Sequence, residues 1–212
     1  MKIRIDNVSK VIKKIKVLDQ VSLEFESGSI TGLKGINGSG KTMIMRVICG
    51  LIRPTEGKVF IDDRELKKDM DFPESIGVLI DSPAFLDNYS AYDNLRYMAS
   101  VKNIVSDKEI LELLDEVELS DAGKKKYRYF SLGMKQRLGI AAAVMKHPDI
   151  ILIDEPTNAL DSKGVDMVKR VLQREKARGA LIVLTCHDYS ILKELSDNIY
   201  FIEEGRIVDH EK

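Results

Sequence analysis

The stretch that decides the fold of this chain is Gly35-Ile36-Asn37-Gly38-Ser39-Gly40-Lys41-Thr42. It matches the phosphate-binding loop pattern G-x-x-x-x-G-K-[ST] at every defined position. The residues at 29–33 before it are strand-like, and those at 43–49 after it follow a helical pattern. A glycine-rich turn could fit the pattern by chance, but the strand and the helix supply the context that the pattern requires. The sequence therefore predicts a nucleoside triphosphate site.

The residue types in this loop suit the binding of phosphate. Its glycines let the backbone curl with the N–H groups pointing inward, where they can surround an anion. The helix that follows adds the positive end of its dipole. We expect Lys41 to reach the terminal phosphates and the Thr42 hydroxyl to be a ligand of Mg²⁺.

Composition narrows the class of protein. The chain has 212 residues, of which 44% are hydrophobic, so it can form one large domain or one domain with an inserted lobe. The net charge of −1 argues against a general polyanion binder. Cys49 and Cys186 lack metal-type spacing, which favours free thiols in a reducing cytosol. No window approaches the ~20 uninterrupted apolar residues of a membrane span, and the N-terminus has no signal-peptide core. We expect a soluble, cytoplasmic protein that acts at a membrane only through a partner.

Strand-like and helical segments alternate along the chain. Alternating apolar residues before residue 27 predict short antiparallel strands with turns at 6–7 and 27–28. A hairpin at 58–63 and a buried strand at 76–80 follow. Continuous apolar runs at 150–153 and 180–184 predict parallel strands covered on both faces. The remaining elements expected are a helix from Gly164 and a terminal hairpin at 200–208.

The region from about 90 to 146 is helical. Ser90 with Asp93 and Ser106 with Glu109 resemble capping boxes. An apolar stripe at i, i+3, i+4 and i+7 follows the second box, and a third helix is predicted to start at Ser131. Because this block lies between two strand-rich regions, we interpret it as an inserted lobe.

Acidic residues and a histidine follow the two apolar strands. Ligands collect at the carboxyl ends of strands in open α/β sheets. Asp154 is therefore expected to hold Mg²⁺, and Glu155 to orient or deprotonate the attacking water. A solvated strand end is the alternative for this pair. His187 follows the strand at 180–184 and could reach the γ-phosphate, although a lone histidine is more often structural.

In addition to the phosphate loop, four segments resemble the nucleotide-binding subunit of ABC transporters. The segments Ile150-Ile151-Leu152-Ile153-Asp154-Glu155-Pro156-Thr157, Asn158-Ala159-Leu160-Asp161 and Thr185-Cys186-His187-Asp188 look like the Walker B, D-loop and switch-histidine motifs, in the family's order. Phe130-Ser131-Leu132-Gly133-Met134-Lys135-Gln136-Arg137 resembles the signature, whose usual core is Leu-Ser-Gly-Gly-Gln. The resemblance covers nearly the whole chain.

The resemblance implies a fold: an α/β phosphate-loop NTPase with a mostly parallel sheet, an N-terminal antiparallel β subdomain and an inserted helical subdomain. Residues 1–212 would form a single ATP-binding domain, with 1–81 and 147–212 as the core and 82–146 as the helical subdomain.

It also implies an ATPase that binds ATP and Mg²⁺. Two copies would sandwich ATP, so that Ser131 and Gly133 contact the γ-phosphate held by the other copy. The Ser131 cap gives the signature helix an anion-binding N-terminus of its own. Closure on ATP would drive a separate membrane-spanning permease, with this chain peripheral on the cytoplasmic face. The second ATPase subunit would be an identical chain, and no nucleic acid is expected.

Three departures from the family pattern stand out. Asp81 occupies the place of the usual Q-loop glutamine and is a candidate Mg²⁺ ligand, with residues 82–87 expected to face the permease. The signature carries Leu132 and Met134 where glycine and glutamine are usual. The stretch at 10–14 lacks the aromatic residue that usually stacks on adenine, so Val11 or Ile12 would give only apolar contact.

The acidic residue and this signature variant look like the bacitracin and lantibiotic exporter branch, which implies export of antimicrobial peptides. The alternatives are a soluble ABC-type ATPase acting on nucleic acid or ribosomes, a phosphate-loop kinase, and a subunit that binds ATP without hydrolysing it. The basic stretch 124–129 could suggest nucleic acid, but a solvated loop is favoured by the net charge.

Overall fold

The computed structural model describes residues 1–101 and 105–212. The elements are, in chain order, β1 (Lys2–Ile12), β2 (Ile15–Glu26), β3 (Ile30–Lys34), α1 (Lys41–Ile48), β4 (Glu56–Ile61), β5 (Arg64–Glu65), β6 (Ile76–Leu79), α2 (Ala91–Ser100), α3 (Asp107–Glu116), the 3₁₀ turns η1 (Ser120–Ala122) and η2 (Tyr127–Tyr129), α4 (Leu132–Val144), β7 (Ile150–Ile153), α5 (Ser162–Ala177), β8 (Leu181–Thr185), α6 (Tyr189–Leu195), β9 (Asn198–Glu203) and β10 (Arg206–Glu211).

The strands form two sheets. One is antiparallel, with the order β2-β1-β4-β5, and the other has the order β10-β9-β3-β8-β7-β6. In the second sheet β9, β3, β8, β7 and β6 run parallel, and only β10 is antiparallel to its neighbour. This arrangement confirms the predicted α/β fold with a mostly parallel sheet and an N-terminal antiparallel unit.

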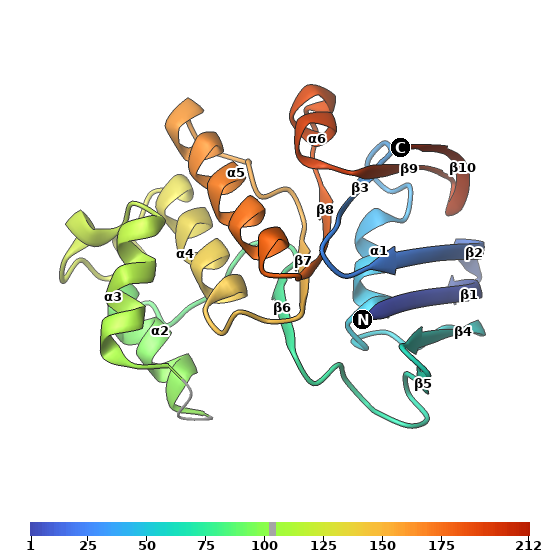
Figure 1. Cartoon of the computed structure of the whole chain (residues 1–212), viewed down its shortest axis with the longest axis horizontal. Helices are drawn as coiled ribbons and strands as arrows, with labels where there is room; N and C mark the ends of the chain where they lie inside the picture. The colour runs from blue at the N-terminus through green and yellow to red at the C-terminus, as the bar shows by residue number, and fades with distance from the viewer. Residues whose placement is uncertain (102–104) are drawn as a thin grey trace.

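Helix α1 lies between the two sheets (Figure 1). Ile44, Met45 and Ile48 are fully buried there, in a core shared with the inner faces of both sheets. The short strand β7 is buried on both faces, which explains why its sequence is apolar at every position. Ile150 and Leu152 belong to the core around α1, whereas the alternate residues of the strand belong to the core on the other face of the sheet.

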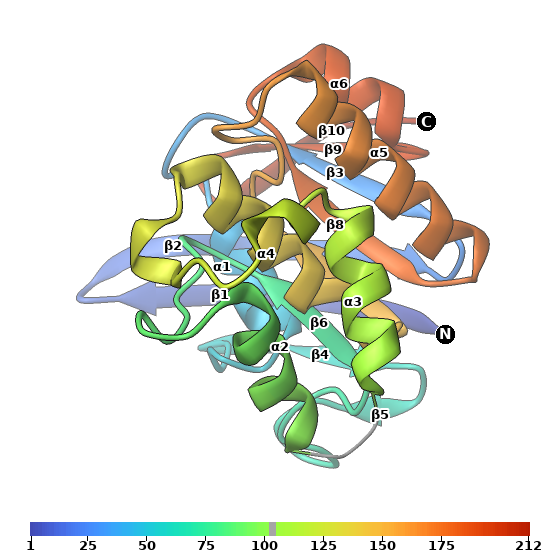
Figure 2. The same ribbon diagram turned by 90° about the vertical axis from the view of Figure 1, so that its left-hand side faces the viewer.

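Helices α2 and α3 lie at one end of the molecule, and the antiparallel sheet lies at the opposite end (Figure 1). Figure 2 shows the end with α2 and α3 facing the viewer. Both predicted capping boxes are present, at Ser90 and at Ser106. The apolar stripe that starts at Ile110 is buried as predicted. Helix α4 begins after Ser131, which caps it, and packs on β6 and β7.

The structure corrects the predicted local structure in two places. The turn predicted at 6–7 is wrong, because β1 continues through it. Asn7 takes a left-handed conformation (φ 51°) in a bulge opposite β2, a conformation that asparagine tolerates. Helix α6 was not predicted; Asp188 caps this short helix. Helix α5 starts at Ser162, close to the predicted start, and Asp161 caps it through the Gly164 amide at 2.9 Å.

Candidate nucleotide-binding and hydrolysis site

The phosphate loop joins the carboxyl end of β3 to the first turn of α1. Only glycine fits at position 35, because neighbouring atoms approach its backbone closely. A Cβ there would lie 2.3 Å from the Ile202 carbonyl oxygen and 2.5 Å from Ser39 Oγ. Gly40 precedes the helix with φ 112°, and no side chain caps α1 within the described residues. The first amides of α1 therefore keep their N–H groups for a ligand, as an anion site requires.

Lys41 folds back over this loop. Its Nζ donates hydrogen bonds to the carbonyl oxygens of Gly35, at 2.7 Å, and Ile36, at 2.9 Å. Burial lowers the pKa of the Lys41 amine, and the nearby carboxylates of Glu155 and Asp154 oppose this effect. An ammonium group held in a partly desolvated loop is placed to gain strongly from an incoming phosphate.

Asp154 is held by hydroxyl groups on both sides. Thr42 Oγ1 donates to Asp154 Oδ2 at 2.7 Å, and Thr185 Oγ1 donates to Asp154 Oδ1 at 2.6 Å. The parallel pairing of β7 with β8 brings the two strand ends together, and α1 supplies Thr42 from the other side. The predicted partners Thr42 and Asp154 are thus in direct contact.

Glu155 and His187 are also brought together. Glu155 Oε2 accepts a hydrogen bond from the His187 backbone amide at 2.8 Å, and His187 Nε2 lies 3.7 Å from Glu155 Oε1. The Glu155 backbone is fixed in a left-handed conformation (φ 51°) by Thr185, whose Oγ1 accepts from its amide at 2.9 Å, and by Gln136, whose Nε2 donates to its carbonyl at 3.0 Å. The carboxylate therefore has a fixed direction beside Asp154.

These groups line one cavity of about 430 Å³. Its lining comprises Val17, Asn37, Gly38, Gly40, Lys41, Thr42, Met43, Arg46, Asp154, Glu155 and His187. Loop amides and Lys41 make one side of it, and the strand-end acids and His187 make another. The cavity thus combines groups that bind phosphate with groups that can hold a metal and activate water.

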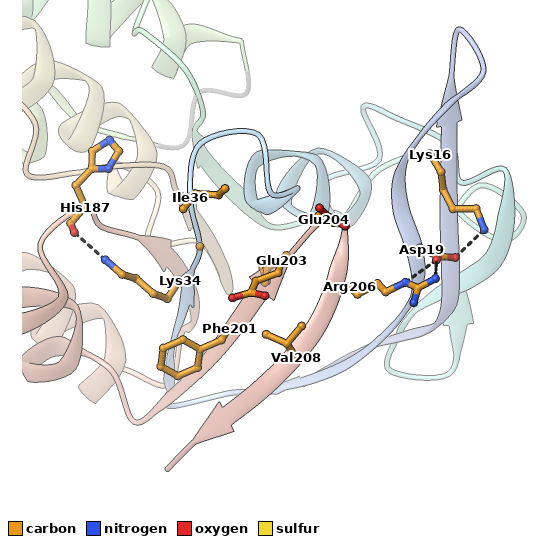
Figure 3. A pocket seen from close by; sticks show the side chains of 12 residues that line it. Lys16, Asp19, Lys34, Ile36, His187, Phe201, Glu203, Glu204, Arg206 and Val208 are labelled. Carbon is orange, nitrogen blue, oxygen red and sulfur yellow. Dashed lines mark hydrogen bonds and ion pairs between the residues drawn. The ribbon is translucent and has the colours of Figure 1, made fainter.

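A wider hollow of about 920 Å³ lies beside it, between the start of the phosphate loop and the β9–β10 hairpin (Figure 3). Lys34 donates to the His187 carbonyl at 2.8 Å on one side, and Asp19 pairs with Lys16 and Arg206 at the far end. The acidic residues 203–204 also line it. The smaller cavity is lined by the loop residues that open α1 and by Lys41, so it is the better phosphate site despite its size.

Ser131 and Gly133 lie apart from that cavity. Ser131 caps α4 by accepting from the Met134 amide at 3.2 Å. A Cβ on Gly133 would lie 2.8 Å from the Ala159 carbonyl oxygen, so this glycine packs against the loop after Asp154-Glu155. Leu132 between them is 67% exposed. The signature segment therefore presents an exposed helix N-terminus, and neither Ser131 nor Gly133 lines the phosphate cavity of its own chain.

Asp81 lies at the carboxyl end of β6, next to the strand that leads to Asp154. Its carboxylate forms an ion pair with Arg46 of α1. Asp81 also lines a second cavity, of about 550 Å³, together with Asp154, Glu155 and Gln136. Asp81 thus lies at the predicted edge of the sheet, and its ion-pair partner Arg46 was not predicted from the sequence.

Oxygen donors for a divalent cation are present at Thr42 and Asp154. Within residues 1–101 and 105–212, no cluster of three or more His, Cys, Asp or Glu side chains could hold a metal alone. Two protein oxygens beside a phosphate site are the donor set typical of Mg²⁺, which usually takes its remaining ligands from phosphates and water. The residues therefore fit this ion.

Sequence reasoning missed three residues of the site. Val17 of β2, and neither Val11 nor Ile12, lines the phosphate cavity. Thr185 could have been found from its place at the end of the strand next to Asp154. Arg46 lies one helical turn after Thr42, so helical periodicity would have placed it on the same face.

The comparisons with known proteins agree with this geometry. The family model described as ABC transporter matches residues 18–158. The uncharacterized ABC transporter ATP-binding protein YybJ of Bacillus subtilis (strain 168) is 46% identical over 99% of this chain and 96% of its own length. The lantibiotic transport ATP-binding protein SrtF of Streptococcus pyogenes is 36% identical over 97% and 89%. The bacitracin transport ATP-binding protein BcrA of Bacillus licheniformis is 34% identical over 98% and 68%.

Among solved structures, the dimeric post-hydrolysis state of the ATP-binding cassette MJ0796 bound to ADP and Pi matches with a TM-score of 0.89. It is 27% identical, and the match covers 99% of this chain and 98% of that one. The fold and the site define a phosphate-loop ATPase. The chain belongs to the ABC transporter family, as an ATP-binding cassette with ATPase activity. This confirms the predicted family and enzyme class, and the kinase and nucleic-acid alternatives are not favoured.

None of the helices in the described part of the chain combines the length and the apolar character needed to cross a bilayer.

Proposed function

We propose that this chain hydrolyses MgATP to drive a separate membrane-spanning permease that exports an antimicrobial peptide or peptide antibiotic. The contact of Thr42 with Asp154, beside Glu155 and Lys41 in one cavity, is the observation that carries the ATPase chemistry. The exporter assignment is supported by the relatives named for lantibiotic and bacitracin transport.

Each residue of the cavity has a role in this reaction. The amides of residues 35–42 and Lys41 bind the phosphates, while Thr42 and Asp154 hold Mg²⁺, which neutralises charge on the phosphates when bound. Glu155 accepts a proton from water as the water oxygen bonds to the γ-phosphorus. The bond from that phosphorus to the bridging oxygen breaks, and ADP and phosphate leave. The contact with His187 fixes the Glu155 carboxylate, and the imidazole stabilises the γ-phosphate.

Two copies act together in this proposal. Ser131 and Gly133 lie on an exposed helix start away from the phosphate cavity of their own chain. An anion-binding helix N-terminus in that position suits the phosphate of a second chain. The dimeric form of the related cassette MJ0796 supports this arrangement. We also propose Asp81 as an additional metal-facing acid, and residues 82–146 as the helical subdomain inserted into the core of 1–81 and 147–212.

Residues 82–87 follow Asp81, on the way to α2, and we assign to them the surface that faces the permease. The chain would then lie at the cytoplasmic face of the membrane. A pull-down from detergent-solubilised host membranes, with tagged Glu155→Gln protein and MgATP, tests this assignment. Recovery of a multi-span protein is expected. Recovery of ribosomes, nucleic acid or soluble proteins alone would contradict it.

The substrate class is tested in cells. Removing the gene should lower the inhibitory concentration of bacitracin or of a lantibiotic for the host. Wild-type protein should restore it, and Glu155→Gln protein at equal abundance should not. Equal sensitivity of the deleted and restored strains to both peptide classes would overturn the exporter assignment while leaving the ATPase chemistry untouched.

A further inference from the structure

Arg46 is the basic residue in the last turn of α1, one helical turn beyond Thr42. It lines the phosphate cavity, and its Nη2 pairs with Asp81 Oδ2. The Arg46 side chain is 34% exposed and that of Asp81 is 60% exposed. An ion pair at this exposure adds little to global stability. Its importance lies in which two segments it joins.

Asp81 begins a segment that leaves the sheet beside the catalytic acids. The Asp154 amide donates to the Leu79 carbonyl at 2.7 Å, which fixes the end of β6 against the end of β7. Asp81 itself has a left-handed backbone (φ 61°). Aspartate tolerates this conformation better than most residues other than glycine. The contact with Arg46 fixes the position of its carboxylate.

The segment 82–90 is in turn bonded to the residues just before the signature. Tyr127 Oη donates to the Pro83 carbonyl at 2.5 Å, and the Tyr127 amide donates to the Tyr89 carbonyl at 2.8 Å. The Arg128 amide donates to the Asp87 carbonyl at 3.1 Å. Tyr127 is buried against Phe85, with ring centroids 5.4 Å apart. Segment 82–90 and the η2 turn, which lies just before α4, therefore form one bonded unit.

We propose that Arg46 is a positioning residue that holds the Asp81 carboxylate at the edge of the phosphate cavity and so attaches segment 82–90 to the phosphate-binding helix. Through Tyr127 the same attachment reaches the signature segment. The Arg46–Asp81 pair then links the nucleotide cavity to the surface assigned to the permease. The role of this link in transport rests on the proposed function, but the attachment itself does not.

Hydrogen exchange, followed by mass spectrometry on the nucleotide-free full chain, tests the attachment. Arg46→Ala should raise exchange in peptides covering 82–90 by about two- to fivefold, as the loss of an exposed ion pair allows. Asp81→Ala should give a similar rise, and the double variant no more than either single one. Arg46→Lys should restore part of the protection, because it keeps the charge.

Arg96→Ala is the matched control, since it removes an exposed arginine of α2 that pairs with Asp107 at 3.5 Å. It should leave exchange in 82–90 unchanged. Unchanged exchange in Arg46→Ala, or additive effects in the double variant, would overturn the proposal.

A second arm uses MgADP as the probe. Its binding should change exchange in 82–90 of the wild type, and this response should be lost in Arg46→Ala when each protein is saturated with MgADP. A response that persists in Arg46→Ala would overturn the link. Absence of MgADP binding to the wild type would instead contradict the proposed function, and the nucleotide-free comparison would still decide the role of Arg46.

Discussion

The Thr42 hydroxyl donates a hydrogen bond to the Asp154 carboxylate at 2.7 Å, although 112 residues separate them in sequence. Thr42 comes from the first turn of the helix between the two sheets, and Asp154 from the end of a central parallel strand. This contact places two oxygen donors suited to a metal beside the loop that we propose binds phosphate.

Asp154→Asn should raise the Mg²⁺ concentration needed for half-maximal ATP hydrolysis by at least about tenfold, because the neutral amide is a much weaker ligand of Mg²⁺. Removal of Mg²⁺ with a chelator should abolish turnover. Phosphate release during a Mg²⁺ titration measures both effects. Asp149→Asn is the control, since Asp149 precedes the same strand at its opposite end. An unchanged Mg²⁺ requirement in Asp154→Asn would remove Asp154 from the metal site.

Glu155→Gln should keep ATP binding but lower kcat by about 10²- to 10⁴-fold, the range for loss of a general base. Glutamine keeps an oxygen that can accept from the His187 amide, so the loop should stay in place. Equilibrium binding of a fluorescent ATP analogue and steady-state phosphate release check the two parts. Glu112→Gln, on an exposed face of α3, is the control. Turnover near the wild-type rate in Glu155→Gln would show that another group activates the water.

Gly133→Ala should lower ATPase activity without removing nucleotide binding to the phosphate loop. The added Cβ would approach the Ala159 carbonyl to 2.8 Å, so the loop at 158–161 must shift or the start of α4 must move. Such overpacking costs about 1–3 kcal/mol. Thermal unfolding should show a lower Tm. Leu132→Ala, at the neighbouring exposed position, should leave Tm nearly unchanged. Normal activity in Gly133→Ala would mean that the signature segment need not keep this packing.

Stability at alkaline pH should depend on Cys186. Burial raises the pKa of its thiol above the ordinary value of 9.0. Above pH 9 the unfolded chain loses this proton before the folded chain does, so the folded protein binds more protons and its free energy of unfolding falls as pH rises. Below pH 9 the thiol is neutral in both states and contributes no such slope.

Cys186→Ala removes this contribution. The Tm of Cys186→Ala minus the Tm of the wild type should therefore be higher at pH 10 than at pH 7.5. Thermal scans at both pH values measure this difference. Cys186 Sγ also contacts Thr157 Oγ1 at 3.3 Å. Cys186→Ala loses this contact at both pH values, so the loss does not affect the comparison. A Tm difference independent of pH would contradict a raised thiol pKa.

Most of the local structure could be predicted from the sequence. Capping at Ser90, Ser106 and Ser131 was readable because a cap is formed within four residues. Apolar continuity identified the buried parallel strands. Local patterns failed at Asn7, where pairing with β2 absorbs an expected turn as a bulge. They also failed at α6, whose seven residues are too few for a clear periodic signal.

Some residues of the site could likewise be predicted from the sequence, and others could not. The sequence by itself determined the phosphate loop, the Asp154-Glu155 pair and the family, because each depends on residue types at fixed short spacing. Only the tertiary structure decided that Val17 lines the cavity, that Thr185 holds Asp154, and that Arg46 pairs with Asp81. Those contacts join residues from different elements, and the packing of α1 between two sheets sets their distances. Spacing along the chain can place Thr185 at a strand end and Arg46 on the face of Thr42, but it does not encode their contacts.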